Sequence, residues 1–220
     1  MMPQMVAALY VEKNGPYYGL PDVDPWDKER DARNYAGPFP VVAHPPCQRW
    51  GRFAKQVEAV HGHQVGDDGG CFAAALTAVR AFGGVIEHPA YSLAFPTFGL
   101  PEPATDEGWT LGFCGGWSCY VEQGRYGHPV KKATWLYIYG VADPPAVRWG
   151  KTADQDTDAA FRWASVRYAG DTAKHRLSSQ WNARTPDAFR DALLGIARSV
   201  DPLTTLRHAV RQYAAGGSTT

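Results

Sequence analysis

The sequence predicts an α/β fold, in which a β-sheet is sandwiched by helices. Short apolar runs of strand length cover residues 6–11 and 39–43, and the second run stops at Pro45-Pro46. Residues 70–82 form a mostly apolar stretch of helix length that ends at paired glycines, after which Val85-Ile86 opens a third strand. Strand, helix and strand in this order indicate a βαβ unit within such a sandwich.

The remaining segments extend this pattern. Two further strands are expected over residues 118–123 and 134–141, while residues 17–36 and 91–116 have the prolines typical of loops. Thr185-Pro186 is a helix start with an N-cap threonine followed by proline. We therefore expect a core over residues 1–141, a small polar insertion over 142–184, closing helices over 185–213 and a frayed tail over 214–220.

Composition limits the class of protein. The chain of 220 residues is 45% hydrophobic, which suits one large domain with a full core. It lacks a run of 18 apolar residues, so no membrane partner is expected, and its four cysteines without a secretory leader favour a cytoplasmic location. Residues 1–120 hold 8 lysines and arginines against 13 acids, and residues 121–220 hold 14 against 9. This uneven distribution of charge favours binding of a polyanion to the C-terminal half; an ordinary solvated surface of mixed charge is the alternative.

Cys47 is the first candidate for chemistry. It follows the predicted strand 39–43 on a loop that Pro45 and Pro46 make stiff, and ligands of open α/β sheets bind at the carboxyl ends of strands. That position suits a nucleophile. A buried cysteine that packs as a small hydrophobe is the alternative.

Two further side chains are expected at the same edge of the sheet. Glu87 ends the strand that follows the connecting helix, so a right-handed βαβ unit brings it beside Cys47. A carboxyl group there is a candidate proton donor. Gln123-Gly124-Arg125 ends a later strand, and we expect Arg125 to supply a cation that lowers the pKa of the Cys47 thiol.

The order of these segments resembles the cytosine-C5 DNA methyltransferases. Pro46-Cys47-Gln48 is similar to their nucleophile loop, and 83–89 (Gly-Gly-Val-Ile-Glu-His-Pro) to their glutamate motif, with His88 in place of the usual asparagine. Gln123-Gly124-Arg125 is similar to their arginine motif, with Gly127 at its second arginine position. The resemblance covers residues 39–140 and suggests a compact, divergent, phage-type member.

This resemblance implies a Rossmann-like methyltransferase sandwich, truncated at its N-terminal strands. It implies that Cys47 adds to C6 of a pyrimidine, that Glu87 contacts N3 and the exocyclic amine, and that Arg125 binds O2 or a phosphate. The implied substrate-binding residues are Pro46, Gln48, His88 and Gln123. The implied partner is DNA or a pyrimidine nucleotide, and a homo-oligomer is left open.

The resemblance also implies S-adenosylmethionine as cofactor. Its usual Phe-x-Gly-x-Gly loop is absent, and residues 12–17 (Glu-Lys-Asn-Gly-Pro-Tyr) stand in its place. Asn14 and Gly15, with the carboxylates of Asp22 and Asp24, are the candidate cofactor-binding residues; a solvated loop is the alternative. Three functions therefore stay open: methyl transfer to cytosine C5 in DNA, a related C5 modification with another donor or a free nucleotide, and non-catalytic nucleic-acid binding.

Other motifs are weaker indications of function. Cys114, Cys119 and His128 lack the second ligand pair of a zinc site, and no metal is expected. Four aromatic residues are candidates to stack on a base, or belong to the core: Trp50, Trp117, Tyr120 and Tyr126.

Overall fold

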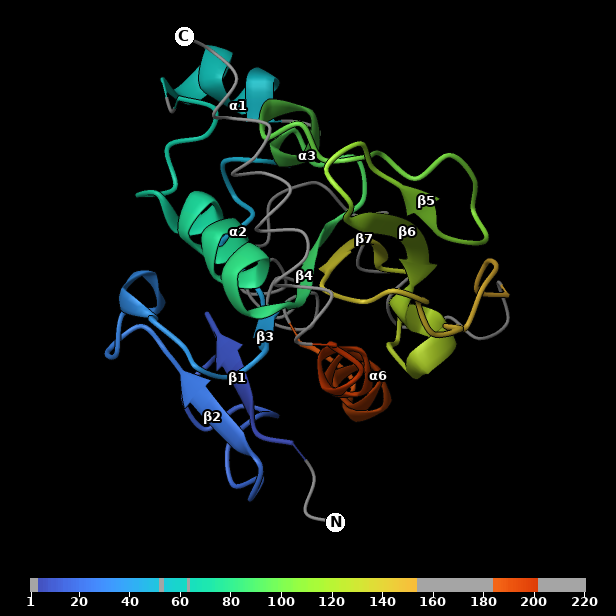
Figure 1. The fold of residues 1–220 in the computed structure, drawn as a ribbon. Helices are drawn as coiled ribbons and strands as arrows, with labels where there is room; N and C mark the ends of the chain where they lie inside the picture. Colours follow the sequence, from blue (N-terminus) through green and yellow to red (C-terminus); the bar gives the residue numbers. More distant parts are fainter. Residues whose placement is uncertain (1–3, 52–53, 63, 154–183, 202–220) are drawn as a thin grey trace, which may run out of the picture.

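One mixed β-sheet organises the protein (Figure 1). The computed structural model describes residues 4–51, 54–62, 64–153 and 184–201. Within these ranges the sheet has the order β2-β1-β3-β4-β7-β6-β5. The first four positions hold parallel strands: β1 (Val6–Leu9), β2 (Val23–Trp26), β3 (Val41–Ala43) and β4 (Gly84–Pro89). The others pair antiparallel: β5 (Thr110–Leu111), β6 (Trp117–Glu122) and β7 (Ala133–Tyr139). The α/β class predicted from the sequence is confirmed.

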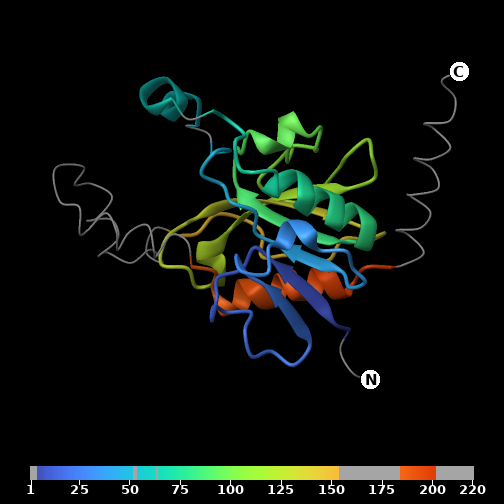
Figure 2. The ribbon, with the colours of Figure 1, turned by 90° about the vertical axis from the view of Figure 1, so that its left-hand side faces the viewer.

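Two longer helices cover opposite faces of the sheet (Figures 1 and 2). Helix α2 (Cys71–Phe82) lies on one face and α6 (Asp187–Arg198) on the other. Shorter helical segments fill the connections: η1 (Ala32–Asn34), α1 (Ala54–His61), α3 (Ala94–Thr97) and η2 (Gln123–Tyr126). The result is a three-layer sandwich.

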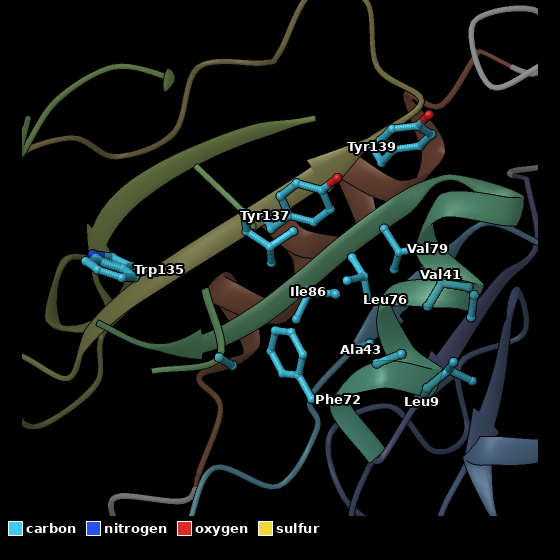
Figure 3. Packing of buried hydrophobic residues seen from close by; sticks show 14 of the residues in the cluster. Leu9, Val41, Ala43, Phe72, Leu76, Val79, Ile86, Trp135, Tyr137 and Tyr139 are labelled. Carbon is cyan, nitrogen blue, oxygen red and sulfur yellow. The ribbon is translucent and has the colours of Figure 1, made fainter. Parts of the chain in front are cut away.

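Successive side chains along the central strands point to opposite faces of the sheet, and each face has its own hydrophobic core. On one face, Leu9, Ala43 and Ile86 pack with α2 through Phe72 and Leu76 (Figure 3). On the other face, residues of the same strands, such as Ala8, Val42 and Val85, pack with Phe189 and Leu193 of α6. Since both faces are covered, β1 and β3 are apolar at every position, which explains why they were recognisable as continuous runs.

Helix α2 begins at a loop that Asp68 closes. Its carboxylate accepts hydrogen bonds from the backbone N–H groups of Gly70 and Phe72 and from the Trp50 indole, at 2.8–2.9 Å. Trp50 is thereby fixed in the core against Phe72. The helix ends at Gly83, whose φ of 77° is in the left-handed region.

Three segments differ from the sequence-based expectation. Residues 23–26, expected to be loop, form β2; it is an edge strand, where Pro25 is tolerated because one side of the strand has no neighbour to receive a hydrogen bond. Strand β5 was also expected to be loop, and helix α1 lies in a span for which no helix was expected. Most of the predicted 142–184 insertion and the stretches 202–213 and 214–220 lie outside the described residues.

The pairing of β3 with β4 depends on Gly84. Val41 lies opposite Gly84, and Ala43 opposite Ile86, in the parallel register. Gly84 has φ of 129°, and a Cβ there would overlap the backbone of Val41. A glycine is required for this close approach.

Replacing Gly84 by Ala is therefore expected to lower the free energy of unfolding by about 3 kcal/mol, because strained backbone and overpacking combine. Urea-induced unfolding measures this change. Gly195→Ala is the matched control: Gly195 lies in α6 with open space around its Cα, so this variant should be as stable as wild type or up to about 1 kcal/mol more stable. Equal stabilities of the two variants would contradict the prediction.

Candidate active site at the carboxyl edge of the sheet

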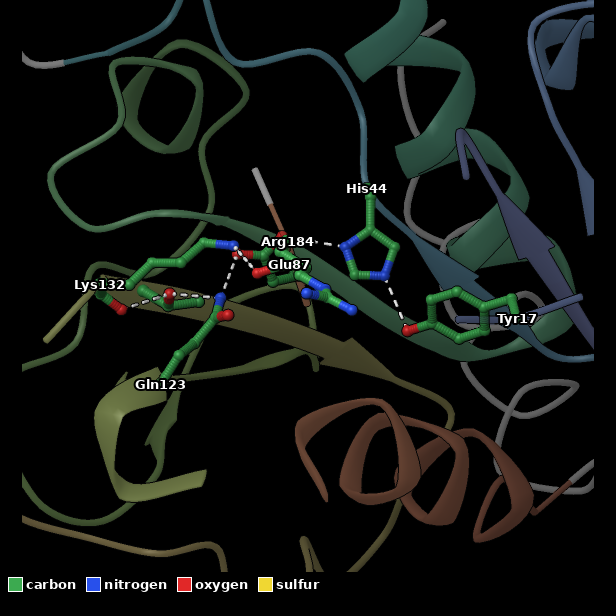
Figure 4. Close-up of polar contacts among 7 residues, drawn as sticks. Tyr17, His44, Glu87, Gln123, Lys132 and Arg184 are labelled. Atoms are coloured by element: carbon green, nitrogen blue, oxygen red, sulfur yellow. Dashed lines mark hydrogen bonds and ion pairs between the residues drawn. The ribbon is translucent and has the colours of Figure 1, made fainter. Parts of the chain in front are cut away.

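Polar side chains from four segments converge at one edge of the sheet (Figure 4). His44 and Cys47 follow β3, and Glu87 lies in the parallel neighbour β4. Strand β7 is antiparallel to both β4 and β6, so its start, at Lys132, meets the end of β6, at Gln123. Cys47 and Glu87 were predicted to lie close together, and the negative charge of Glu87 does act on the Cys47 thiol, whose pKa it raises.

The Glu87 carboxylate is held by donors at both of its oxygens. His44 Nδ1 lies 2.9 Å from Oε2, and Gln123 Nε2 donates to Oε1 at 3.0 Å. Gln123 Nε2 also donates to Thr134 Oγ1 at 3.0 Å. On its far side, His44 Nε2 lies 2.8 Å from the Tyr17 hydroxyl. The carboxylate is thus an acceptor in a chain that runs from Tyr17 to Thr134.

Glu87 is ionised in this arrangement. Burial by itself raises the pKa of its carboxyl, but the hydrogen bond from His44 and the charge of Lys132 outweigh burial and lower the pKa to about 2. A carboxylate of this kind accepts hydrogen bonds. The proton that the sequence analysis assigned to Glu87 therefore has to be supplied by another group.

Cys47 is a thiol, contrary to the expectation that a neighbouring cation lowers its pKa. Burial and the negative charge of Glu87 raise the pKa of Cys47 above its usual range, and Lys132 offsets this only in part. The side chain is half-buried. The nucleophile role predicted from the sequence would therefore require that this proton be removed.

The cation of the site is Lys132. Its positive charge acts on both Glu87 and Cys47, and its Nζ donates to the Arg184 carbonyl at 3.0 Å. Burial lowers the pKa of Lys132, while the two anionic groups oppose that change. Its backbone has φ of 40°, a left-handed conformation uncommon outside glycine. The sequence analysis missed Lys132; the signal was its place directly before the strand that starts at Ala133.

Arg125, predicted to be that cation, points elsewhere. It lies in η2 with an exposed side chain, and its backbone carbonyl accepts a hydrogen bond from Arg148 Nη1 at 2.9 Å. Among the described residues no contact joins Arg125 to Cys47 or Glu87.

The predicted substrate-binding residues divide into three groups. Pro46 and Gln48 are exposed beside Cys47. Gln123 is fully buried, and its Nε2 donates to Glu87. His88 is also fully buried, on the opposite face of β4, where its Nδ1 lies 2.7 Å from Ser92 Oγ and its ring packs on Phe72. Both side chains are thus enclosed by the protein, and each has one buried polar atom without a hydrogen-bond partner, Gln123 Oε1 and His88 Nε2.

The aromatic stacking candidates are core residues. Trp50, Tyr120 and Tyr126 are at most 8% exposed, and Trp117 packs against the α6-side core. None of these four is presented to the Cys47 edge as a free ring.

Asp22 and Asp24, which were predicted to bind S-adenosylmethionine, both have ion-pair partners within the protein. Asp22 precedes β2, at the edge of the sheet opposite to Cys47, and forms an ion pair with Arg198. Asp24 pairs with Arg30 at 2.5 Å and accepts from the Trp26 indole at 2.8 Å.

The loop after β1 gives no cofactor cradle either. Gly15 N donates to the Glu12 carbonyl at 2.9 Å, which closes a tight turn, and Asn14 has φ of 58° and is exposed. The carboxylate that does follow β2 directly is Asp27, and it accepts from the Tyr18 hydroxyl at 2.5 Å and from two backbone N–H groups. The Asp27 carboxylate thus stabilises the turn that follows β2.

Comparisons with known proteins add no assignment: family models, curated proteins and solved structures were compared with the chain, and none matches. Across residues 4–51, 54–62, 64–153 and 184–201, no helix has the length and apolar character needed to cross a membrane. The same residues hold no group of three or more His, Cys, Asp or Glu side chains arranged for a metal ion.

His88 makes stability depend on pH. Burial lowers the pKa of His88 to about 4, although the Glu87 charge and the Pro46 carbonyl oppose the shift. In the unfolded chain His88 is protonated below about pH 6.5, whereas in the folded protein it stays neutral down to about pH 4. The free energy of unfolding therefore falls as the pH decreases from 6.5 to about 4. The loss should amount to roughly 3 kcal/mol, measured by urea unfolding across the pH series.

His88→Asn is the control, since its amide keeps a polar atom near Ser92 but does not titrate. It should lack the additional slope between pH 6.5 and about 4. Identical slopes for the two proteins would show that His88 is not the group responsible.

Proposed function

We propose that the protein modifies C5 of a pyrimidine, most simply cytosine in DNA, through a covalent bond between Cys47 Sγ and C6 of the ring. The observation that carries the proposal is the joint placement of a cysteine, an ionised carboxylate and a partly buried lysine at the carboxyl edge of parallel strands. A protein that only binds nucleic acid needs none of these three side chains.

The chemistry divides into addition and elimination. The Cys47 thiol loses its proton and Sγ adds to C6, so that the C5=C6 electron pair moves to C5 and negative charge spreads toward O2. C5 then takes an electrophile, in the simplest case a methyl group. Loss of the C5 proton to a base returns the electron pair to the ring, and Sγ leaves from C6.

Lys132 is suited to stabilise the charge on the ring. Its side chain is partly buried, and an ammonium group that is partly shielded from water stabilises developing charge more than a fully exposed one. Glu87, as an acceptor, suits the exocyclic amine of cytosine. The donor of the electrophile is not assigned, because Asp22 and Asp24, the carboxylates predicted to hold S-adenosylmethionine, are engaged in ion pairs with Arg198 and Arg30.

Addition at C6 predicts an exchange reaction that needs no donor. The C5 carbanion takes up a solvent proton, so elimination returns the pyrimidine with solvent hydrogen at C5. In D2O, deuterium is expected to enter C5 of cytosine in DNA, or of free cytidine and uridine nucleotides, and mass spectrometry of the nucleosides measures it.

Cys47→Ala should abolish this exchange, whereas Cys71→Ala, which removes another partly buried thiol at the start of α2, should keep it. Exchange that persists in Cys47→Ala would rule out the nucleophile. Absence of exchange by the wild type on every pyrimidine substrate would overturn the proposed function.

Substitutions of Lys132 and of Arg125 are expected to have different effects on the rate of C5 exchange. Lys132→Met should slow C5 exchange by ~100-fold, as removal of one donor to a developing oxyanion does. Arg125→Met should leave the exchange rate close to that of wild type, since its side chain is exposed and apart from the cluster. The reverse result would restore Arg125 as the cation, as the sequence resemblance implied.

A further inference from the structure

Tyr91 is an exposed aromatic residue at the edge of the sheet that holds Cys47. It follows the end of β4 by two residues, and it is 54% exposed. Its backbone φ of 63° lies in the left-handed region, which is rare for a bulky residue. Within the described part of the chain its hydroxyl makes no hydrogen bond. A strained backbone thus presents a large ring to solvent, and strain of this kind is a feature of ligand-binding positions.

The segment that carries Tyr91 is fastened on both sides to the candidate active site. The Ala90 N–H donates to the Ala133 carbonyl at 3.0 Å, at the start of β7, where the cation of the site lies. The Leu93 N–H donates to the Trp50 carbonyl at 2.8 Å, three residues after the candidate nucleophile. The exposed ring is therefore held beside the site by backbone hydrogen bonds.

The ring of Tyr91 lies on the other side of β4 from the Glu87 carboxylate. It packs on Trp135, with ring centroids 5.2 Å apart. Trp135 is opposite His88 in the sheet register and belongs to the core on the α2 face, whereas Glu87 points to the α6 face. A pyrimidine held beside Cys47 and Glu87 thus leaves the Tyr91 ring open, and the next base of the same strand is suited to cover it.

We propose that Tyr91 stacks on the nucleobase next to the target pyrimidine and so positions the substrate strand at Cys47. Aromatic rings bind bases through their faces, whatever the base. Two other large apolar side chains are exposed in the described residues, Leu111 and Phe113, and both lie at the β5–β6 turn, at the opposite edge of the sheet. This inference rests on the proposed function and adds to it a residue that touches the substrate outside the reacting ring.

Two single-stranded DNA probes test the stacking. Both have one central cytosine, whose neighbours are adenines in the first probe and abasic sites in the second. We expect wild type to bind the first probe ~10-fold more tightly by fluorescence anisotropy, as stacking on one base provides. Tyr91→Leu keeps an apolar cover on Trp135 but has no aromatic face, so it should lose this preference. Its KM for C5 exchange on the first probe should rise ~10-fold, with kcat close to that of wild type.

Three further variants serve as controls. Tyr91→Phe keeps the ring and should retain the wild-type preference. Tyr91→Gly removes the ring and suits a φ of 63°, so it should lose the preference in a backbone without strain. Phe113→Ala removes an exposed aromatic ring at the opposite edge and should bind both probes as wild type does.

Binding and exchange together separate this inference from the proposed function. A wild-type preference that persists in Tyr91→Leu and Tyr91→Gly would overturn the role of Tyr91, and the proposed function would stand if exchange still needs Cys47. Loss of the preference in both variants, with no exchange by wild type, would support stacking while the proposed function fails. Equal binding of the two probes by wild type, or binding of neither, would overturn the inference.

Discussion

A buried negative charge on Glu87 is the constraint on which the rest of the site depends. Its carboxylate is taken out of water, so it is stable only where donors and a cation replace the lost hydration. His44, Gln123 and Lys132 do so, and they come from the segments after β3, after β6 and before β7. Removing one of them would leave the charge uncompensated. The three segments are therefore held in one arrangement by the same interaction that prepares the site.

The two faces of β4 explain why adjacent residues have different roles. Side chains alternate along a strand, so Glu87 and His88 lie on opposite faces. Glu87 meets polar groups at the sheet edge on the α6 side, whereas His88 is enclosed by Phe72 and Ser92 on the α2 side. The surroundings of Glu87 favour its charged form, and those of His88 favour its neutral form. The sequence motif at residues 83–89 contains both Glu87 and His88, and by itself it does not show that the two side chains have different surroundings.

The sequence was sufficient for the parts of the fold that depend on local pattern. Continuous apolar runs marked β1 and β3, paired glycines marked the end of α2, and the βαβ connection placed Cys47 near Glu87. Strand β2 was missed because Pro25 and Asp24 are unfavourable in strands, and only its edge position makes them acceptable.

The partners within the site were harder to predict, because they are set by contacts far apart in the chain. His44 meets Tyr17 across 27 positions and Glu87 across 43. Lys132 replaces the expected Arg125 because the antiparallel start of β7, rather than the end of β6, brings a cation to Glu87. Asp22 and Asp24 had the right chemistry for a ribose, but their ion pairs with Arg198 and Arg30 are tertiary contacts that spacing does not reveal.

One lysine serving two acidic groups has a consequence for catalysis. In the resting protein Glu87 carries the negative charge, and that charge helps to keep Cys47 protonated. Lys132 acts in the opposite direction, since its charge lowers the pKa of the thiol that Glu87 raises. In the proposed function, ionisation of Cys47 would place a second negative charge beside Glu87, and Lys132 is the cation that offsets both. A thiol that stays protonated until the substrate arrives is not exposed to oxidants as a thiolate.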